Sequence, residues 1–270
     1  MNFLFLVVLF VYFVNICFAY DENDLKEFLD KRECFNCDLS NADFTDKYLD
    51  RSVIKSSDLS GAIFDNAKLA ASIIESSNFS GASFINADMP SSLIEGSNFR
   101  NTVFNKINLT SSKIINSNFE YSSFLEAKLY GTTFKNSIFD NSSIINANFQ
   151  KSILTFSSFV NVNFNNTLLS LALMDMTNLD SANLTECKIR GVNFSNSNLS
   201  NADLSNSSLR RAIFYKANLE NINYKKSNFY KSNFSYANLV SVDEEDAYFK
   251  TAILCKTKMK KKIVNRDCPN

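Results

Sequence analysis

The chain has no histidine and no tryptophan, and its 270 residues include only two prolines and five glycines. Without histidine, the side chain that most often acts as a base near neutral pH is missing, and a serine nucleophile would lack its usual activating partner. The scarcity of proline and glycine leaves almost no material for flexible linkers. Lysine plus arginine equal aspartate plus glutamate at 28 each, so the net charge is zero. A nucleic-acid-binding protein is expected to be basic, so we expect no nucleic-acid partner.

The chain instead carries a large apolar residue at every fifth position from Leu39 to Met259. Only Glu244 breaks this series of 45 positions. A small residue, for example Ala42 or Ser52, lies two places before most members of the series, and the remaining places are mostly polar. Because 18 of the 26 phenylalanines belong to the series, we expect the aromatic side chains to form the interior.

A period of five fits neither a helix nor a strand. Five helical residues advance by about 140° at about 100° per residue, so the apolar residues would spiral around the helix. On a strand, side chains alternate between two faces, so apolar residues five apart would point to opposite sides. The backbone must therefore bend every five residues, with each pentad sending its large and its small residue to a common axis. This pattern predicts a solenoid with a filled interior.

A second period of 20 residues sets the size of the solenoid. Identical residues recur at this spacing, as in Ile54, Ile74 and Ile94. Four pentads are therefore predicted to make one turn, and residues 37–256 would make 11 turns. With turns stacked about 4.8 Å apart, the rod would be about 50 Å long. Columns of serine and asparagine also recur at this spacing, and we expect them to hydrogen-bond to the backbone and to one another rather than to catalyse a reaction.

Several pentads resemble the Ala-(Asn/Asp)-Leu-X-X unit of the pentapeptide-repeat family. They include residues 42–46 (ADFTD), 202–206 (ADLSN) and 217–221 (ANLEN). The resemblance covers about four fifths of the chain. It implies an all-β fold, a right-handed quadrilateral β-helix of about 11 coils.

The first 19 residues form a nearly continuous apolar run without a charged side chain. Residues 1–19 therefore resemble a signal peptide cleaved after Ala19, although no lysine or arginine precedes the apolar core. Because the run approaches the length of a membrane span, an uncleaved N-terminal anchor is the alternative. In either case we expect export across a membrane to a secreted, periplasmic or lumenal location, with no other membrane contact.

Residues 20–36 are predicted to form a short amphipathic helix that caps the open end of the solenoid. Asp21 or Asn23 could cap the helix N-terminus. An exposed solenoid end needs such a cap, because it would otherwise leave apolar residues and backbone groups unpaired. The apolar residues at helical spacing are Leu25, Phe28 and Leu29.

Cys34 and Cys37 form an isolated Cys-X-X-Cys motif. Zinc would require two further ligands, which the chain does not supply at a matching spacing, so we expect no metal. A redox motif is not favoured either, because no βαβ pattern surrounds it. Cys37 occupies the small inward position of its pentad, as Cys187 does later, so a core-filling role and a local disulfide both remain open. The resemblance to lumenal family members, which carry a similar motif before the first repeat, favours the disulfide.

Residues 257–270 are predicted to cap the other end. Cys255, Met259 and Cys268 resemble the C-terminal cap of lumenal pentapeptide-repeat proteins, and the resemblance implies a Cys255–Cys268 disulfide that closes the final coil. The lysines at 260–262 depart from the Pro-Asp-Gly of that cap. The acidic run at 243–246 lacks the spaced ligands and turn glycine of a calcium loop, so we expect a solvated corner.

One region breaks the polar character of the outward positions. Contiguous exposed apolar surface often marks a partner contact, while local distortion of the wall is the alternative. Within this region, Ile153 and Leu173 lie 20 residues apart, as do Phe156 and Met176, so each pair should be neighbours in adjacent coils. The apolar residues at nominally outward positions are Ile153, Phe156, Val160, Leu168, Leu171, Leu173 and Met176.

A filled coil offers no cavity of the size that ligands require. We therefore expect a non-enzymatic exported structural or protein–protein interaction module, with an unidentified protein partner, no cofactor and no small-molecule substrate. The alternative is a DNA-mimic inhibitor or protector of type II topoisomerase, a role known within the family. Those members are acidic and cytosolic, whereas this chain is neutral and is predicted to be exported.

Overall fold

The computed structural model describes residues 20–243 and 247–269. The segment 1–19, predicted to be a signal peptide, and the irregular position Glu244 lie outside the described residues. Among the described residues, none of the helices has the length and apolarity needed to cross a bilayer.

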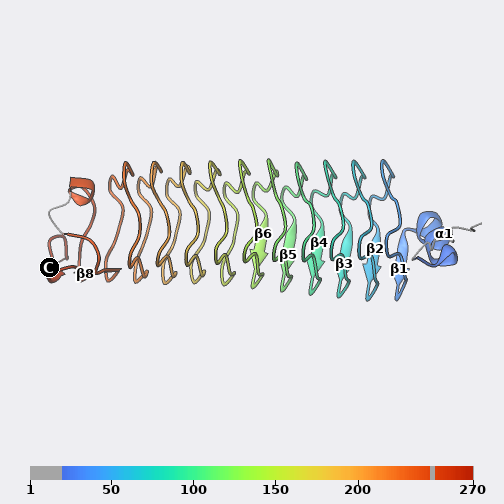
Figure 1. Ribbon diagram of the computed structural model, residues 1–270, viewed down its shortest axis with the longest axis horizontal. Coiled ribbons are helices and arrows are strands. Elements are labelled where there is room, and N and C mark those ends of the chain that lie inside the picture. The colour runs from blue at the N-terminus through green and yellow to red at the C-terminus, as the bar shows by residue number, and fades with distance from the viewer. Residues whose placement is uncertain (1–19, 244–246, 270) are drawn as a thin grey trace, which may run out of the picture.

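The described chain forms one stack of similar coils, with a helix at one end and the C-terminal segment at the other (Figure 1). Helix α1 spans Glu22–Lys31. The first coils contribute one strand each to a six-stranded parallel sheet in chain order. Paired residues are 20 apart, as in Ile54 and Ile74, which confirms the predicted coil length. The strands of this sheet are β1 (Glu33–Phe35), β2 (Val53–Lys55), β3 (Ile73–Glu75), β4 (Leu93–Glu95), β5 (Lys113–Ile115) and β6 (Thr133–Lys135).

Each coil has four walls. Beyond the strands, parallel bridges join successive coils at three further places, for example Asp38 to Asp58, Asp43 to Ile63 and Tyr48 to Lys68. We number the walls 1 to 4 in chain order.

Each wall is centred on one large apolar residue. In the first coil these central residues are Leu39 for wall 1, Phe44 for wall 2, Leu49 for wall 3 and Ile54 for wall 4.

The corners between walls are made by residues with a left-handed backbone. From Asn41 to Tyr236, the residue two places after each central residue has positive φ, at 58° for Asn41, 59° for Asp46, 62° for Arg51 and 52° for Ser56. This conformation turns the chain from one wall onto the next and is tolerated best by glycine and asparagine. The predicted bend every five residues is therefore confirmed, and the bend lies at a defined position of the pentad.

The interior of the coil is filled by aromatic and aliphatic side chains that form one continuous apolar cluster. On wall 2, phenylalanines 44 to 124 stack in a column with ring centroids 4.7 to 5.2 Å apart. On wall 1, phenylalanines 79 to 159 form a second column at 4.8 to 5.1 Å. Stacks of this kind add to the stabilisation that burial provides.

The polar columns have the structural roles expected of them. Ser112 Oγ donates a hydrogen bond to the Met89 carbonyl at 2.9 Å and accepts one from Ser92 N at 3.1 Å, so a buried hydroxyl links two coils. Asn98 Nδ2 donates to Asn78 Oδ1 at 3.0 Å in an amide ladder on wall 1. These side chains satisfy polar groups along the wall.

Helix α1 closes the N-terminal end. Asp21 is its N-cap and accepts hydrogen bonds from Asn23 N at 2.7 Å and Asp24 N at 3.1 Å. Phe28 is fully buried and meets the ring of Phe44 edge-on, with centroids 5.4 Å apart. Leu29, expected on the apolar face, is 38% exposed because the helix covers only the narrow end of one coil.

At the C-terminal end the stack turns back on itself. Strand β7 (Asn238–Leu239) pairs in parallel with β8 (Thr257–Met259), and β8 pairs antiparallel with β9 (Ile263–Val264). The short helix η1 (Ala247–Phe249) precedes β8. The antiparallel strand β9 ends the parallel series.

Candidate functional site

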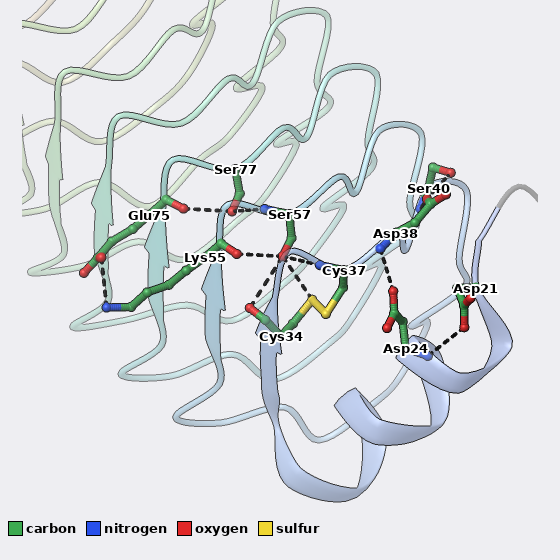
Figure 2. The surroundings of a disulfide bond; sticks show 10 residues. All are labelled: Asp21, Asp24, Cys34, Cys37, Asp38, Ser40, Lys55, Ser57, Glu75 and Ser77. Carbon is green, nitrogen blue, oxygen red and sulfur yellow. Dashed lines mark hydrogen bonds and ion pairs between the residues drawn. A yellow bond between two sulfur atoms is a disulfide. The ribbon is translucent and has the colours of Figure 1, made fainter.

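Both predicted cysteine pairs are bonded in the structure. The Cα atoms are 5.7 Å apart for Cys34 and Cys37, and 4.7 Å apart for Cys255 and Cys268. The N-terminal pair lies between α1 and the first coil (Figure 2), where Ser57 Oγ accepts a hydrogen bond from Cys37 N at 3.1 Å. The two disulfides therefore lie at opposite ends of the rod.

Cys187 is the free cysteine among the described residues, and it is buried. Burial raises the pKa of its thiol to about 12, because the thiolate would lose its hydration. Its Sγ lies 3.1 Å from the Phe164 carbonyl oxygen. A neutral, buried thiol fills space, as predicted for the small inward position.

Within residues 20–243 and 247–269, no group of three or more cysteine, aspartate or glutamate side chains is placed to hold a metal ion. The open depressions on the rod surface are lined largely by polar side chains of the walls. One of them, described below, lies beside exposed apolar side chains.

Five of the outward apolar residues gather on wall 4 and its two corners, and we call them the apolar patch. Ile153 and Leu173 form a parallel bridge between adjacent coils. The patch is confined to two coils, because the same column continues with Thr133 on one side and Asn193 on the other. The exposed fractions are 37% for Ile153, 50% for Phe156, 55% for Leu171, 43% for Leu173 and 48% for Met176.

Two residues of the predicted set lie elsewhere. Val160 follows the central residue of wall 1, and Leu168 precedes the central residue of wall 3, and both are half-buried. The seven residues therefore do not make one surface. The four-wall arrangement separates residues that appear equivalent in the linear sequence.

Three residues of the apolar patch occupy corners with a left-handed backbone. The φ angles are 62° for Phe156, 63° for Leu171 and 58° for Met176. A residue with a bulky side chain costs roughly 1–2 kcal/mol in this conformation. The same conformation recurs at the corners of the rod from Asn41 to Tyr236, so these three residues are distinguished by large apolar side chains that stay about half exposed.

A second feature was missed in the sequence: a group of exposed cations on wall 3 and its corner with wall 4. We call this group the basic face. Among the described residues, none of its members forms an ion pair with a carboxylate. Its members are Lys188, Arg190, Arg210, Arg211 and Lys231.

An aromatic ring lies among these cations. Arg210 and Lys231 lie 5.2 and 5.4 Å from the ring centroid of Tyr230. Sorting the sequence into columns of 20 would have revealed the basic face, because Arg190 and Arg210 share one column and Arg211 and Lys231 share another.

The apolar patch and the basic face meet at one corner. Leu171, Gly191 and Arg211 follow one another there in successive coils. Gly191 has φ of 68°, and a Cβ at this position would lie 3.1 Å from Leu171 Cδ2, so the glycine leaves room for the leucine. An open depression of about 420 Å³ results, lined by Leu171, Gly191, Arg190 and Arg211 together with polar neighbours.

The model of the family described as pentapeptide repeats matches eight copies, over residues 33–70, 62–101, 117–155, 177–214 and 212–243. Comparison with curated proteins found no match.

Solved structures are similar at low identity. HetL, a pentapeptide repeat protein involved in heterocyst differentiation regulation from the cyanobacterium Nostoc sp. strain PCC 7120, is 18% identical with a TM-score of 0.43, covering 89% of this chain and 97% of that chain. QnrB1, a plasmid-mediated fluoroquinolone resistance protein, is 14% identical with a TM-score of 0.40, covering 71% and 93%.

A pentapeptide repeat protein from the Arabidopsis thaliana thylakoid lumen is 26% identical with a TM-score of 0.23, covering 42% of this chain and 71% of that chain. The family match extends over more than half of the sequence and agrees with the coil geometry. The chain therefore belongs to the pentapeptide-repeat family.

Proposed function

We propose that this protein is a non-enzymatic, exported interaction rod that binds a protein partner through the apolar patch. The observation that carries the proposal is the position of Phe156, Leu171 and Met176. They are about half exposed, at corners where a bulky side chain is conformationally unfavourable. Burying them against a partner would offset that cost, since buried apolar side chains contribute about 1.5–3 kcal/mol each.

The filled interior favours a scaffold role over a catalytic role. The coil is filled by one continuous apolar cluster, so a substrate would have to bind on the outside of a wall. The topoisomerase alternative is less well supported, because DNA mimicry calls for an acidic surface. This chain has no net charge and carries an exposed group of cations on wall 3.

Export is supported by the apolar segment 1–19 and by the two bonded cysteine pairs. Disulfides persist mainly in oxidising compartments. Fractionation of cells that express the tagged chain, with N-terminal sequencing of the product, tests this part. Recovery of the protein in the cytosol with residues 1–19 intact would contradict it.

Affinity capture from the producing cells tests partner binding. The test variant carries Phe156→Asn, Leu171→Gly and Met176→Asn, which keep residues suited to the left-handed corners. The matched control is Tyr121→Asn, because Tyr121 is 50% exposed at a corner with φ of 59° on another part of the rod.

We expect a protein that the wild type and the Tyr121→Asn control retain and that the triple variant loses. Retention that is unchanged by the triple variant would refute binding through the apolar patch.

A further inference from the structure

Four ion pairs in the N-terminal half of the rod join a cation to a carboxylate 20 residues away, in the same column of the adjacent coil. Lys55 and Glu75 lie 2.9 Å apart on wall 4, and Arg100 and Glu120 lie 2.5 Å apart on wall 1. Opposite charges stacked across neighbouring strands stabilise a sheet, whereas like charges destabilise it.

Within the described part of the chain, the basic face has no such ion pairs. Arg190 and Arg210 share one column of adjacent coils, and Arg211 and Lys231 share the next. Like charges in the same column of adjacent strands destabilise a sheet rather than stabilise it. The nearby carboxylate of Glu186, at the preceding corner of the same coil as Lys188, is exposed and forms no ion pair with the basic face. The chain therefore leaves several exposed cations that an external anion would neutralise.

The basic face is directly continuous with the apolar patch. Leu171 N donates a hydrogen bond to the Arg190 carbonyl at 3.0 Å, and Gly191 N donates to the Arg210 carbonyl at 3.0 Å. Arg190 therefore lies one coil beyond Leu171 and Arg210 two coils beyond it. The depression lined by Leu171 and Arg211 joins the two surfaces. A ligand at this corner would meet apolar side chains on one side and cations on the other.

The shape of the corner selects among anionic ligands. Walls 3 and 4 face different directions, so a flat lipid bilayer could rest on only one of them. A nucleic acid or a sulfated polysaccharide would supply anions for wall 3 but no apolar side chains for wall 4. A polypeptide segment supplies both and can bend around the corner.

Asp175 affects where the carboxylates of a bound segment can lie. It lies on wall 4 between Leu173 and Met176 in the chain, so it disfavours a carboxylate placed over the apolar patch. Beside Leu173 and Met176, a ligand's carboxylates are therefore favoured on wall 3 and its apolar side chains on wall 4, while Lys135 lies over Phe156 at the other edge of the patch.

We propose that the partner's contact is an acidic segment with apolar side chains, which crosses the corner at Leu171 and Arg211 and binds both surfaces at once. This inference rests on the proposed function, because it names the chemistry of the partner that the apolar patch binds.

Selection from a library of random peptides tests the inference without knowledge of the partner. Peptides of about 12 residues span about 40 Å when extended, enough to cross two walls. The full chain is the bait, and enriched peptides are measured by fluorescence anisotropy against wild type and variants. We expect enrichment of aspartate and glutamate together with leucine, phenylalanine or methionine.

The variants separate the two surfaces. Arg190→Ser with Arg211→Ser should weaken peptide binding by about tenfold or more, and added salt should weaken wild-type binding in the same direction. The matched control, Lys113→Ser with Lys128→Ser, removes two exposed cations from the N-terminal half and should bind like wild type. Thermal unfolding of the arginine variant should be unchanged or shifted to higher temperature, because the substitutions relieve repulsion.

Each outcome decides the inference. Enriched peptides that lack acidic residues, or that bind the arginine variant like wild type, would overturn it. If such peptides no longer bind the triple variant of the apolar patch, the proposed function is supported without the acidic-segment assignment. The acidic-segment assignment would also be overturned if no peptides were enriched, or if phosphatidylserine vesicles bound through Arg190 and Arg211. Affinity capture tests the proposed function separately.

Discussion

Phe119→Ala tests whether the stacked interior holds the rod together. The Phe119 ring is 1% exposed on wall 1, and its centroid lies 5.1 Å from that of Phe99 and 4.8 Å from that of Phe139, both in stacked geometry. Phenylalanine-to-alanine changes in a core cost about 3–5 kcal/mol. The loss of two stacked pairs, each about 0.5–1.5 kcal/mol, places the expected loss near the upper end of that range.

The matched control is Phe156→Asn at an exposed corner. The Phe156 ring is 50% exposed, so its removal loses roughly half of the burial term, about 1 kcal/mol. The ring also lies 5.7 Å from Lys135 Nζ, a contact that contributes about 0.5 kcal/mol. Relief of the left-handed backbone returns about 1 kcal/mol. The net change is expected to lie within about 1 kcal/mol of zero, because these effects oppose each other.

Urea unfolding followed by far-ultraviolet circular dichroism measures both variants, since the chain has no tryptophan to report by fluorescence. Because each coil contacts only its neighbours, hydrogen exchange should show the loss of protection in Phe119→Ala concentrated in coils near residue 119. A loss below about 2 kcal/mol for Phe119→Ala, or a loss equal to that of Phe156→Asn, would refute the filled-core account.

Three further predictions concern the thiols and one carboxyl. The Cys187 thiol, whose pKa is raised to about 12 by burial, should react with iodoacetamide at pH 8 about a thousandfold more slowly in the folded chain than in urea, as measured by mass spectrometry; equal rates would contradict this. Cys268→Ser opens the loop closed with Cys255 and should lower the stability of the last coil by about 3 kcal/mol, seen as lost amide protection in β8 and β9; unchanged protection would refute it. Asp43 has its pKa lowered, first by the hydrogen bond from the Thr45 hydroxyl and then by that from the Thr45 N–H. The ionised Asp43 carboxylate therefore stabilises the fold above its unfolded pKa, and this stabilisation is lost as the pH falls through the folded pKa. Thr45→Val should raise the pKa of Asp43 in a carbon-detected NMR titration. An unchanged pKa would contradict the assignment.

The sequence by itself determined the repeat, the coil and the contents of the interior. Each coil contacts mainly its neighbours, so the periods of five and 20 specify both the local bend and the long-range pairing. Ile54 facing Ile74 follows from that register alone, as does burial of the phenylalanine columns. The helix before the first coil was also predictable, because Asp21 provides its cap and Phe28 its apolar contact.

Only the tertiary structure decided which outward residues share a surface. A period of five does not state which residue makes the bend, and from Asn41 to Tyr236 the positive φ angles place that bend two residues after each central residue. That placement assigns Leu171 and Met176 to opposite corners of wall 4 and moves Val160 and Leu168 to other walls. It also places Arg190 and Arg210 in one column and sets Arg190 in the coil next to Leu171. Residues 20 apart in the chain become direct neighbours through the stacking of coils, so the combined apolar and basic surface appears only when the chain is wound.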